Sequence, residues 1–139
     1  MIDRWTSTSV LTGVARSTTT VELDRGVVEY RFDRRDAATV VVLHGGHMNA
    51  GLALGEDVFA DAGYSVLVPS RPGYGRTPLS TGHTTAEFAD VIPSLCDHLG
   101  ITRVAAVVGI SAGGPTAITT AARHPDLVER LVLQSALTA

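Results

Sequence analysis

The stretch Val104–Gly114, with the sequence VAAVVGISAGG, decides how the rest of the chain is interpreted. It begins as a short apolar run rich in valine, which predicts a buried β-strand. The run ends at Gly109, and Ser111 and Gly113 follow at alternate positions, so the turn has the pattern G-x-S-x-G. Pro115 then opens a segment that is compatible with a helix over 116–123. This order of strand, sharp turn and helix predicts an exposed serine hydroxyl at a helix N-terminus.

The G-x-S-x-G pattern has a physical reason. A backbone that turns sharply from a strand into a helix brings neighbouring segments too close for side chains, and glycine has none. The turn strains the backbone of the serine, and the free N–H groups of the helix N-terminus favour negative charge beside its hydroxyl. The pattern therefore predicts that Ser111 is a nucleophile. A tight strand-to-helix turn with an inert serine is the alternative interpretation.

Composition narrows the class of protein. A chain of 139 residues predicts one domain, and a net charge of −3 with mixed signs argues against nucleic-acid binding. Cys96 is the only cysteine, which excludes an internal disulfide and suits a reducing compartment. No secretory leader is visible near Asp3 and Arg4, and no apolar run is long enough to span a membrane. We therefore expect a cytoplasmic protein without membrane contact.

The chain before residue 39 predicts a hairpin at the edge of a sheet. Residues 1–17 have no clear pattern and predict a loose segment or a short strand. Residues 18–23 and 27–32 are strand-like, and 24–26 form a turn. The second strand alternates, which predicts that Glu29 and Arg31 lie on a solvent-facing side.

Three later segments are apolar throughout or nearly so, which is typical of strands buried on both faces of a sheet. They are 39–43, 64–68 and the strand before Ser111, and a last strand is predicted over 128–133. Helices are predicted over 54–62, 84–99 and 116–123. In the second helix Thr84 and Glu87 form a capping box, and Pro93 is expected to kink the helix or remove one hydrogen bond.

The order of these elements predicts an α/β fold. Strands alternating with helices give a three-layer sandwich around a mostly parallel sheet of about six strands, with the N-terminal hairpin antiparallel. The carboxyl ends of parallel strands meet at one edge, so 44–47 (HGGH), 70–78 and Ser111 are expected there together. In the second of these loops, Arg71 is expected either to stabilise an anion or to cap loop carbonyls.

Three motifs in this order give the chain a resemblance to the N-terminal half of the α/β-hydrolases. They are His44-Gly45-Gly46, Arg71-Pro72-Gly73-Tyr74-Gly75 and Gly109-Ile110-Ser111-Ala112-Gly113, and the resemblance covers residues 18–139.

The resemblance implies a role for three residues. Ser111 matches the nucleophile, and the backbone N–H groups of Gly46 and Ala112 match the oxyanion-hole donors. It also implies a small-molecule acyl substrate, such as an ester, amide or lactone. Nothing in the sequence suggests an organic cofactor or a metal, because no acidic or cysteine ligand lies beside His44 and His47.

The sequence departs from the family after Ser111. The family's acid and histidine follow later strands, whereas beyond Ser111 this chain offers only Asp126, Glu129 and His124. Since a helix rises about 1.5 Å per residue, His124 is expected roughly 20 Å from Ser111, too far for proton transfer.

Three hypotheses follow from this departure. The chain is part of a serine hydrolase whose acid and base come from a C-terminal half, in a longer product or a second polypeptide. Alternatively it is a non-catalytic binding or interaction module, which folds alone or self-associates through the open edge of its sixth strand. In the third hypothesis another histidine of the same edge replaces the base; His44, His47 and His83 are candidates, and His47 is the best placed. The first hypothesis predicts that this chain alone is nearly inactive.

Overall fold

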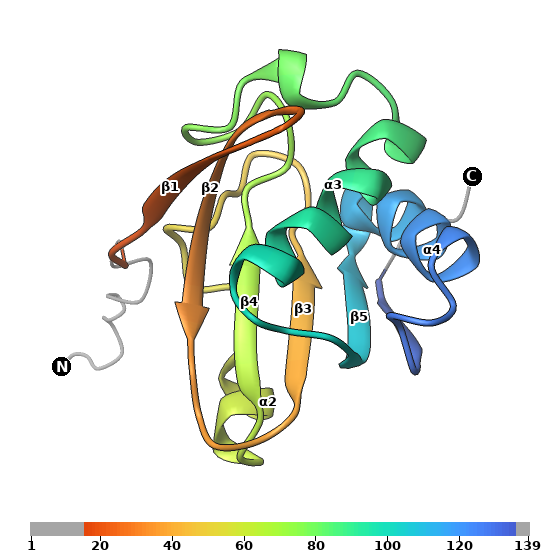
Figure 1. The fold of residues 1–139 in the computed structure, drawn as a ribbon. Coiled ribbons are helices and arrows are strands. Elements are labelled where there is room, and N and C mark those ends of the chain that lie inside the picture. The colour runs from red at the N-terminus through yellow and green to blue at the C-terminus, as the bar shows by residue number, and fades with distance from the viewer. Residues whose placement is uncertain (1–15, 136–139) are drawn as a thin grey trace, which may run out of the picture.

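The computed structural model describes residues 16–135, and its centre is a six-stranded β-sheet (Figure 1). The strand order across the sheet is β1-β2-β4-β3-β5-β6. The strands are β1 (Thr19–Leu23), β2 (Gly26–Asp33), β3 (Thr39–Leu43), β4 (Ser65–Pro69), β5 (Val104–Ile110) and β6 (Leu131–Gln134).

The first two strands form the predicted antiparallel hairpin. They pair from Thr19–Tyr30 to Leu23–Gly26, and β2 then pairs antiparallel with β4. Gly26 begins β2 with a φ of 137°, a conformation that side chains rarely tolerate. Within this hairpin only β1 is an edge strand, because β2 has neighbours on both sides.

The other four strands are parallel, as predicted from their apolar sequences. β3 pairs with both β4 and β5, and β5 pairs with β6. All five residues of β3 and all five of β4 are buried. Because alternate side chains point to opposite faces, Val41 and Leu43 join one apolar cluster while Val40 and Val42 join the other.

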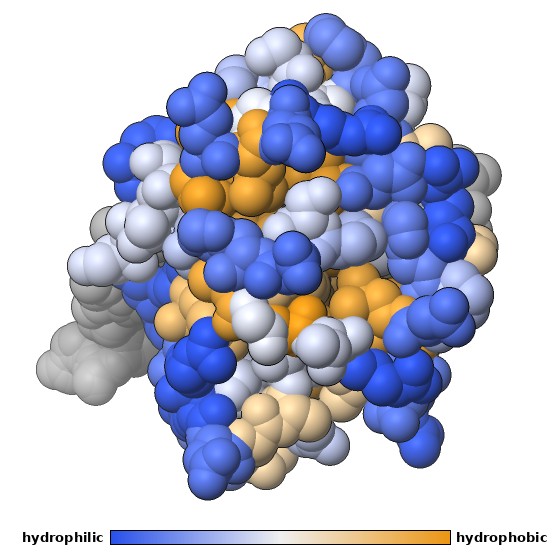
Figure 2. Space-filling view, in the orientation of Figure 1, coloured by the Kyte–Doolittle hydropathy of each residue, from blue (hydrophilic) through white to orange (hydrophobic). Residues whose placement is uncertain are grey.

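The two faces of the sheet are covered unequally. Helices α3 (Thr85–His98) and α4 (Gly114–Arg123) pack against one face, where they bury Phe88, Ile92 and Ala117 among other residues (Figure 1). The outer surface of this face is mostly hydrophilic, with apolar residues visible in recesses between polar ones (Figure 2). On the other face lies α2 (Asp57–Asp61), which has no buried residue. Two short 3-10 turns, η2 (Leu79–Thr81) and η3 (Ser111–Gly113), complete the elements.

Two segments differ from the sequence predictions. The helix predicted over 54–62 is the single turn α2, and the strand predicted over 128–133 is β6, displaced to 131–134. Val128 makes only an isolated bridge to Val104. Continuous pairing with β5 begins at Leu131, opposite Val107, and the strand therefore starts there. Helix α3 continues past Pro93.

The N-terminal segment is described only from Arg16, whose backbone N–H donates to the Gly51 carbonyl at 2.7 Å; the prediction for residues 1–15 lies outside the described residues. Between residues 16 and 135 no helix has the length and apolar character that crossing a membrane requires.

Candidate active site

Ser111 lies at the carboxyl edge of the sheet, between the end of β5 and the start of α4. Its φ of 51° is in the left-handed region, which is rare for a residue with a side chain. The residue begins η3, which leads directly into α4. Backbone strain of this kind costs on the order of 1–3 kcal/mol and persists only where the surroundings impose it. The elbow therefore has the strained geometry that the motif predicts.

The glycines on both sides of Ser111 are required by packing. A Cβ on Gly113 would collide with the carbonyl oxygens of Leu43 and His44. A Cβ on Gly109 would lie 2.8 Å from the Cβ of Ala117, which is closer than side-chain atoms approach. The elbow thus packs directly against the end of β3 and against helix α4, which follows the elbow.

The loop after β3 borders the serine. A Cβ on Gly45 would lie 3.2 Å from the Cβ of Ser111, so the two backbones are neighbours. Gly46 is half-buried, and a Cβ there would lie 3.9 Å from the Tyr74 hydroxyl. His47 follows with a φ of 59° and an exposed side chain. The fold thus brings together the segments that contain Gly46, His47, Ser111 and Ala112, as expected from the meeting of parallel strand ends.

His44 is a buried structural residue. Its Nε2 accepts a hydrogen bond from the backbone N–H of Arg71 at 2.8 Å, so the ring proton lies on Nδ1, which donates to the Gly45 carbonyl at 2.7 Å. Burial, together with the charge of Arg71, outweighs the Gly45 bond and lowers the pKa of His44 from 6.5 to about 4. A neutral ring with both nitrogens engaged joins the loops after β3 and β4 and has no free atom for proton transfer to Ser111.

Arg71 caps a loop carbonyl, which is one of the two roles expected for it. Its Nε donates to the His44 carbonyl at 2.8 Å, and its guanidinium lies 4.9 Å from the centre of the Tyr74 ring. The Tyr74 ring meets His44 edge-on, with centroids 5.2 Å apart. Burial lowers the pKa of Arg71, and among residues 16–135 its Nη2 is a buried atom without a hydrogen-bond partner.

Glu29 is buried, contrary to the expectation from the sequence. It was predicted on a solvent-facing side of β2, but it is 6% exposed. Its carboxylate accepts hydrogen bonds from Ser70 Oγ at 2.7 Å, Thr18 Oγ1 at 2.8 Å and Arg76 Nε at 3.0 Å. Burial alone would raise the pKa of Glu29, but these hydrogen bonds lower it from 4.5 to about 2.

The same side of β2 contains a second buried pair. Arg31 donates to Glu56 at 2.6 Å, and Glu56 is 2% exposed. The prediction of a polar face open to solvent is therefore wrong, because the loops after β3 and β4 cover it. No local pattern in the sequence reveals this burial, because the partners Arg76 and Glu56 lie 47 and 25 residues away along the chain.

The acids and histidine that follow Ser111 in the sequence are bound elsewhere or lie at the far end of α4. His124 Nε2 lies 2.8 Å from Asp90 Oδ1, and Arg123 donates to the same carboxylate at 2.6 Å. His124 is the C-cap of α4, whereas Ser111 precedes its first turn. Among residues 16–135 no hydrogen bond joins the Ser111 hydroxyl to a histidine or a carboxylate.

Within residues 16–135, neither His83, the remaining histidine candidate, nor Cys96 makes a hydrogen bond to Ser111. His83 is exposed, and its backbone N–H donates to Glu87 at 2.6 Å as part of the α3 cap. Cys96 is buried in the core, and burial raises the pKa of its thiol to about 12. Within the described part of the chain, no three His, Cys, Asp or Glu side chains are grouped so that they could hold a metal ion.

Comparison with known proteins gives one family. Residues 38–139 match the family model described as the alpha/beta hydrolase fold. An uncharacterized hydrolase, YcgS, of Bacillus subtilis is 41% identical over 123 residues, which are 88% of this chain and 43% of the relative. A 2-hydroxy-6-oxononadienedioate/2-hydroxy-6-oxononatrienedioate hydrolase of Paraburkholderia phymatum is 36% identical over 112 residues, 76% of this chain and 38% of that protein.

Solved structures agree with the family model. An alpha/beta hydrolase fold protein from Nakamurella multipartita matches with a TM-score of 0.77 and 39% identity, over 86% of this chain and 41% of that one. The epoxide hydrolase CorEH matches with a TM-score of 0.73 at 23% identity, over 88% of this chain and 43% of that one. The chain thus spans less than half the length of the relatives it matches.

Proposed function

The chain belongs to the α/β-hydrolase fold family, and from that premise we propose that it is the nucleophile-bearing part of a serine hydrolase. The observation on which the proposal depends is the left-handed backbone of Ser111, with a φ of 51°, at an elbow that touches the loop after β3. This position at the carboxyl edge of the sheet, next to the loop that contains Gly45 and Gly46, supports a role for the Ser111 hydroxyl as the nucleophile. The relatives are named as hydrolases, which supports an enzyme of the same broad class.

The proposed reaction is acyl transfer to water. Ser111 Oγ attacks the carbonyl carbon of an ester, amide or lactone, and the carbonyl oxygen becomes an oxyanion. The backbone N–H groups of Gly46 and Ala112 donate to that oxyanion. The general base takes the proton of the Ser111 hydroxyl and passes it to the leaving group as the bond between the carbonyl carbon and that group breaks. Water then hydrolyses the acyl-enzyme and restores the hydroxyl. The contact between Gly45 and Ser111 supports this arrangement, because it places the two donor segments side by side.

The proposed reaction also needs a general base. Among residues 16–135, no histidine makes a hydrogen bond to the Ser111 hydroxyl. We assign the acid and the histidine to the C-terminal part of the family's fold, which this chain does not span. Within the chain, His47 is the candidate for a substitute base, since it is exposed in the loop that borders the serine. Serine without a base is a weak nucleophile, so the chain alone should react slowly.

A non-catalytic binding module is the second candidate function. The observation that favours it is the lack, among the described residues, of any hydrogen bond from the Ser111 hydroxyl to a basic group. The two functions predict different outcomes with a reagent that reports on serine nucleophilicity alone.

A fluorophosphonate probe followed by intact-mass measurement tests the proposal. Two samples are incubated with the probe. One is the purified chain by itself, and the other is the chain co-expressed and purified with the C-terminal half of a family member. We expect one adduct per chain, mapped to Ser111, slow for the chain alone and faster by at least about 100-fold in the completed protein, since a general base contributes about 10²–10⁴ in rate.

The controls are matched serine and histidine variants. Ser111→Ala should abolish the adduct, whereas Ser94→Ala, at an exposed position on α3, should leave it unchanged. His47→Ala slows labelling of the chain alone only if His47 acts as the substitute base. An adduct that persists in Ser111→Ala, or no adduct even in the completed protein, would show that Ser111 is not a nucleophile and favour the binding module.

A further inference from the structure

A small pocket lies between the loop after β4 and the starts of helices α3 and α4. Its volume is about 140 Å³, and its lining includes Arg71, Pro72, Leu79, Thr84, Thr85 and Thr116. Since one water molecule takes up about 30 Å³, the pocket has room for a carboxylate and a few carbon atoms. Among the described residues that line it none is acidic, so its permanent charge is the guanidinium of Arg71.

The guanidinium of Arg71 lacks a counter-ion among the described residues. Its Nε donates to the His44 carbonyl, but its buried Nη2 has no hydrogen-bond partner, and no carboxylate of residues 16–135 forms an ion pair with it. Arg31, which is also largely buried, instead donates to Glu56 at 2.6 Å. A buried cation without a counter-ion is costly, and burial accordingly lowers the pKa of Arg71. An anion in the pocket would supply the missing charge.

Thr116 adds a hydroxyl without a partner to the same pocket. It lies in the first turn of α4 and is 3% exposed. The hydroxyls of Thr119 and Thr120 each donate to the carbonyl four residues earlier, as helical threonines commonly do. Within residues 16–135 the Thr116 hydroxyl makes no such bond. Since buried hydroxyls are nearly always paired, this one is available to a ligand in the pocket.

The start of α3 contributes backbone donors. Thr84 is the N-cap: its hydroxyl accepts from the Glu87 N–H, and its carbonyl accepts from the Phe88 N–H. The N–H groups of Thr85 and Ala86 have no acceptor within the described part of the chain. The N-terminus of this 14-residue helix carries a partial positive charge, which favours an anion. A cation, a hydroxyl and a helix start therefore line one small space.

The pocket is next to the candidate nucleophile. Arg71 Nε lies 2.8 Å from the His44 carbonyl oxygen, and a Cβ on Gly113 would lie 2.6 Å from the same oxygen. Arg71 and the elbow therefore contact one backbone atom from its two sides. Thr116 follows Ser111 closely, in the helix that begins at the elbow. A molecule whose carbonyl carbon lies at Ser111 can thus reach the pocket with a short arm.

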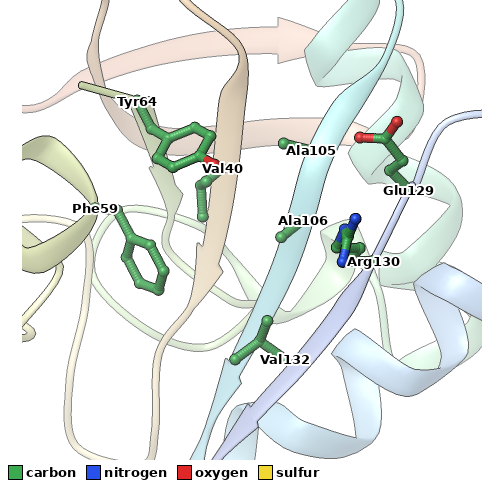
Figure 3. Close-up of a pocket in the computed structure, with 8 residues that line it drawn as sticks. All are labelled: Val40, Phe59, Tyr64, Ala105, Ala106, Glu129, Arg130 and Val132. Atoms are coloured by element: carbon green, nitrogen blue, oxygen red, sulfur yellow. The ribbon is translucent and has the colours of Figure 1, made fainter. Parts of the chain in front are cut away.

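A larger groove on the opposite face of the sheet lacks these features. Its volume is about 380 Å³, and its apolar lining includes Val40, Phe59, Tyr64, Ala106 and Val132 (Figure 3). The two charged residues that line it, Glu129 and Arg130, have opposite signs. It involves the early residues of β3 and β5, whereas Ser111 follows the end of β5. This groove therefore neither favours an anion nor borders the elbow.

We propose that the pocket binds a carboxylate of the substrate, so that the acyl substrate of Ser111 is an anionic one. The inference rests on the proposed function and adds a substrate class to it. The carboxylate accepts hydrogen bonds from the Arg71 guanidinium and the Thr116 hydroxyl, and the start of α3 stabilises its charge. One guanidinium balances one negative charge, which suits a carboxylate better than a doubly charged phosphate. Pro72 and Leu79 provide an apolar wall for the carbon chain.

Binding of two matched esters tests the proposal. Monomethyl succinate and dimethyl succinate differ by one free carboxylate. Each is titrated into the isotopically labelled 139-residue chain, and amide resonances are followed by NMR. We expect the monomethyl ester to bind at least about tenfold more tightly, because only its carboxylate forms charge-assisted hydrogen bonds. It should also shift the N–H resonances of Thr85 and Ala86. Equal affinities, or shifts confined to other parts of the chain, would overturn the proposal.

Substitutions locate the carboxylate in the pocket. Arg71→Gln should lower the affinity for the monomethyl ester by at least about tenfold, whereas Arg103→Gln, at an exposed position before β5, should leave it unchanged. Because Arg71 also caps the His44 carbonyl, a second variant guards against a folding defect. Thr116→Val removes an unpartnered hydroxyl at nearly constant shape, and it should lower the affinity about fivefold, with Thr102→Val as its exposed control. Unchanged affinity in Thr116→Val would overturn the proposal, whether or not Arg71→Gln folds.

Two further samples separate this inference from the proposed chemistry and from binding of free anions. Ser111→Ala should bind the monomethyl ester as the unmodified chain does, so a serine that does not react with the fluorophosphonate probe leaves the binding result intact. Acetate and inorganic phosphate, which lack an arm that reaches Ser111, should each bind at least about tenfold more weakly than the monomethyl ester. Acetate or phosphate that binds as tightly would show a site for free anions and overturn the assignment to the substrate.

Discussion

At the scale of single residues, the candidate site depends on glycines that have no space for a methyl group. Gly113 lies against the carbonyl oxygens of Leu43 and His44, which are backbone atoms at the end of β3. A side chain there cannot be accommodated by a rotamer change, since the atoms it meets belong to a central strand. The position of Ser111 therefore follows from the close contact between the elbow and β3.

Gly113→Ala should destabilise the protein strongly. We expect a loss of about 3 kcal/mol in the free energy of unfolding, at the upper end of the range for overpacking, because backbone must move. Urea unfolding followed by circular dichroism measures it. Gly46→Ala is the matched control: a Cβ there would meet only the Tyr74 hydroxyl, at 3.9 Å, so its stability should be close to that of the unmodified chain. Equal stability of the two variants would contradict the packing argument.

At the scale of elements, α3 is the helix whose limits are set most clearly by local interactions. Thr84 Oγ1 accepts from the Glu87 N–H at 3.1 Å, and the Glu87 side chain accepts from the His83 N–H at 2.6 Å. The capping box predicted from the sequence is therefore present, with its return bond made to His83. The helix then buries Phe88, Ile92 and Leu95 at helical spacing against the sheet.

Thr84→Ala should weaken this helix start. Losing a threonine N-cap costs about 1 kcal/mol of stability, because the Glu87 N–H loses its acceptor. Chemical unfolding measures the free energy of unfolding of this variant and of Thr102→Ala. Because Thr102 is exposed and lies outside any helix or strand, the second variant reports the general effect of removing a threonine hydroxyl. If both variants lose the same free energy of unfolding, the hydrogen bond from the Glu87 N–H to Thr84 makes no measurable contribution to stability.

At the scale of the whole molecule, Glu29 connects elements that are distant in the sequence. Its carboxylate binds the loop after β4 through Ser70 and Arg76, and Ser70 Oγ in turn accepts from the Ala50 N–H in the loop after β3. Those two loops contain His44, Gly46 and Tyr74 beside the elbow. One buried carboxylate thus holds the loop after β4 and, through Ser70, the loop after β3 that borders Ser111.

The pKa of Glu29 predicts how stability depends on pH. Hydrogen bonds hold that pKa at about 2 in the folded protein, below its ordinary value of 4.5, so the folded state binds its proton less readily than the unfolded chain. The stabilisation is complete above about pH 4.5 and is lost as the pH falls towards about 2. Its size is on the order of 3 kcal/mol, at about 1.4 kcal/mol per pKa unit.

Glu29→Gln tests this assignment. The variant should be less stable at pH 7 and should lose less of its stability between pH 5 and pH 2, as measured by urea unfolding at each pH. Glu22→Gln, at an exposed position on β1, is the control and should follow the unmodified chain. A Glu29→Gln curve parallel to that of the unmodified chain would show that another group is responsible for the acid sensitivity.

The sequence alone determined the features that depend on neighbouring residues. The buried strands β3, β4 and β5, the cap of α3 and the glycine-bounded elbow at Ser111 were all predictable, because each is set within a few residues by apolar content, capping or steric limits. The meeting of three loops at one edge was predictable as well, since parallel strands leave no other arrangement. What each loop residue does there remained open.

Only the tertiary structure decided the features that depend on distant partners. Glu29 binds Arg76 across 47 residues and Arg31 binds Glu56 across 25, so their alternation in β2 indicated a solvent-facing side that the folded chain covers. The start of β6 was set by pairing with β5 and not by its own sequence, in which Val128 suits a strand as well as Leu131 does. Many residues of a chain are chemically able to serve as a given hydrogen-bond partner or to begin a given strand. Which residue does so is decided by the packing of the folded chain.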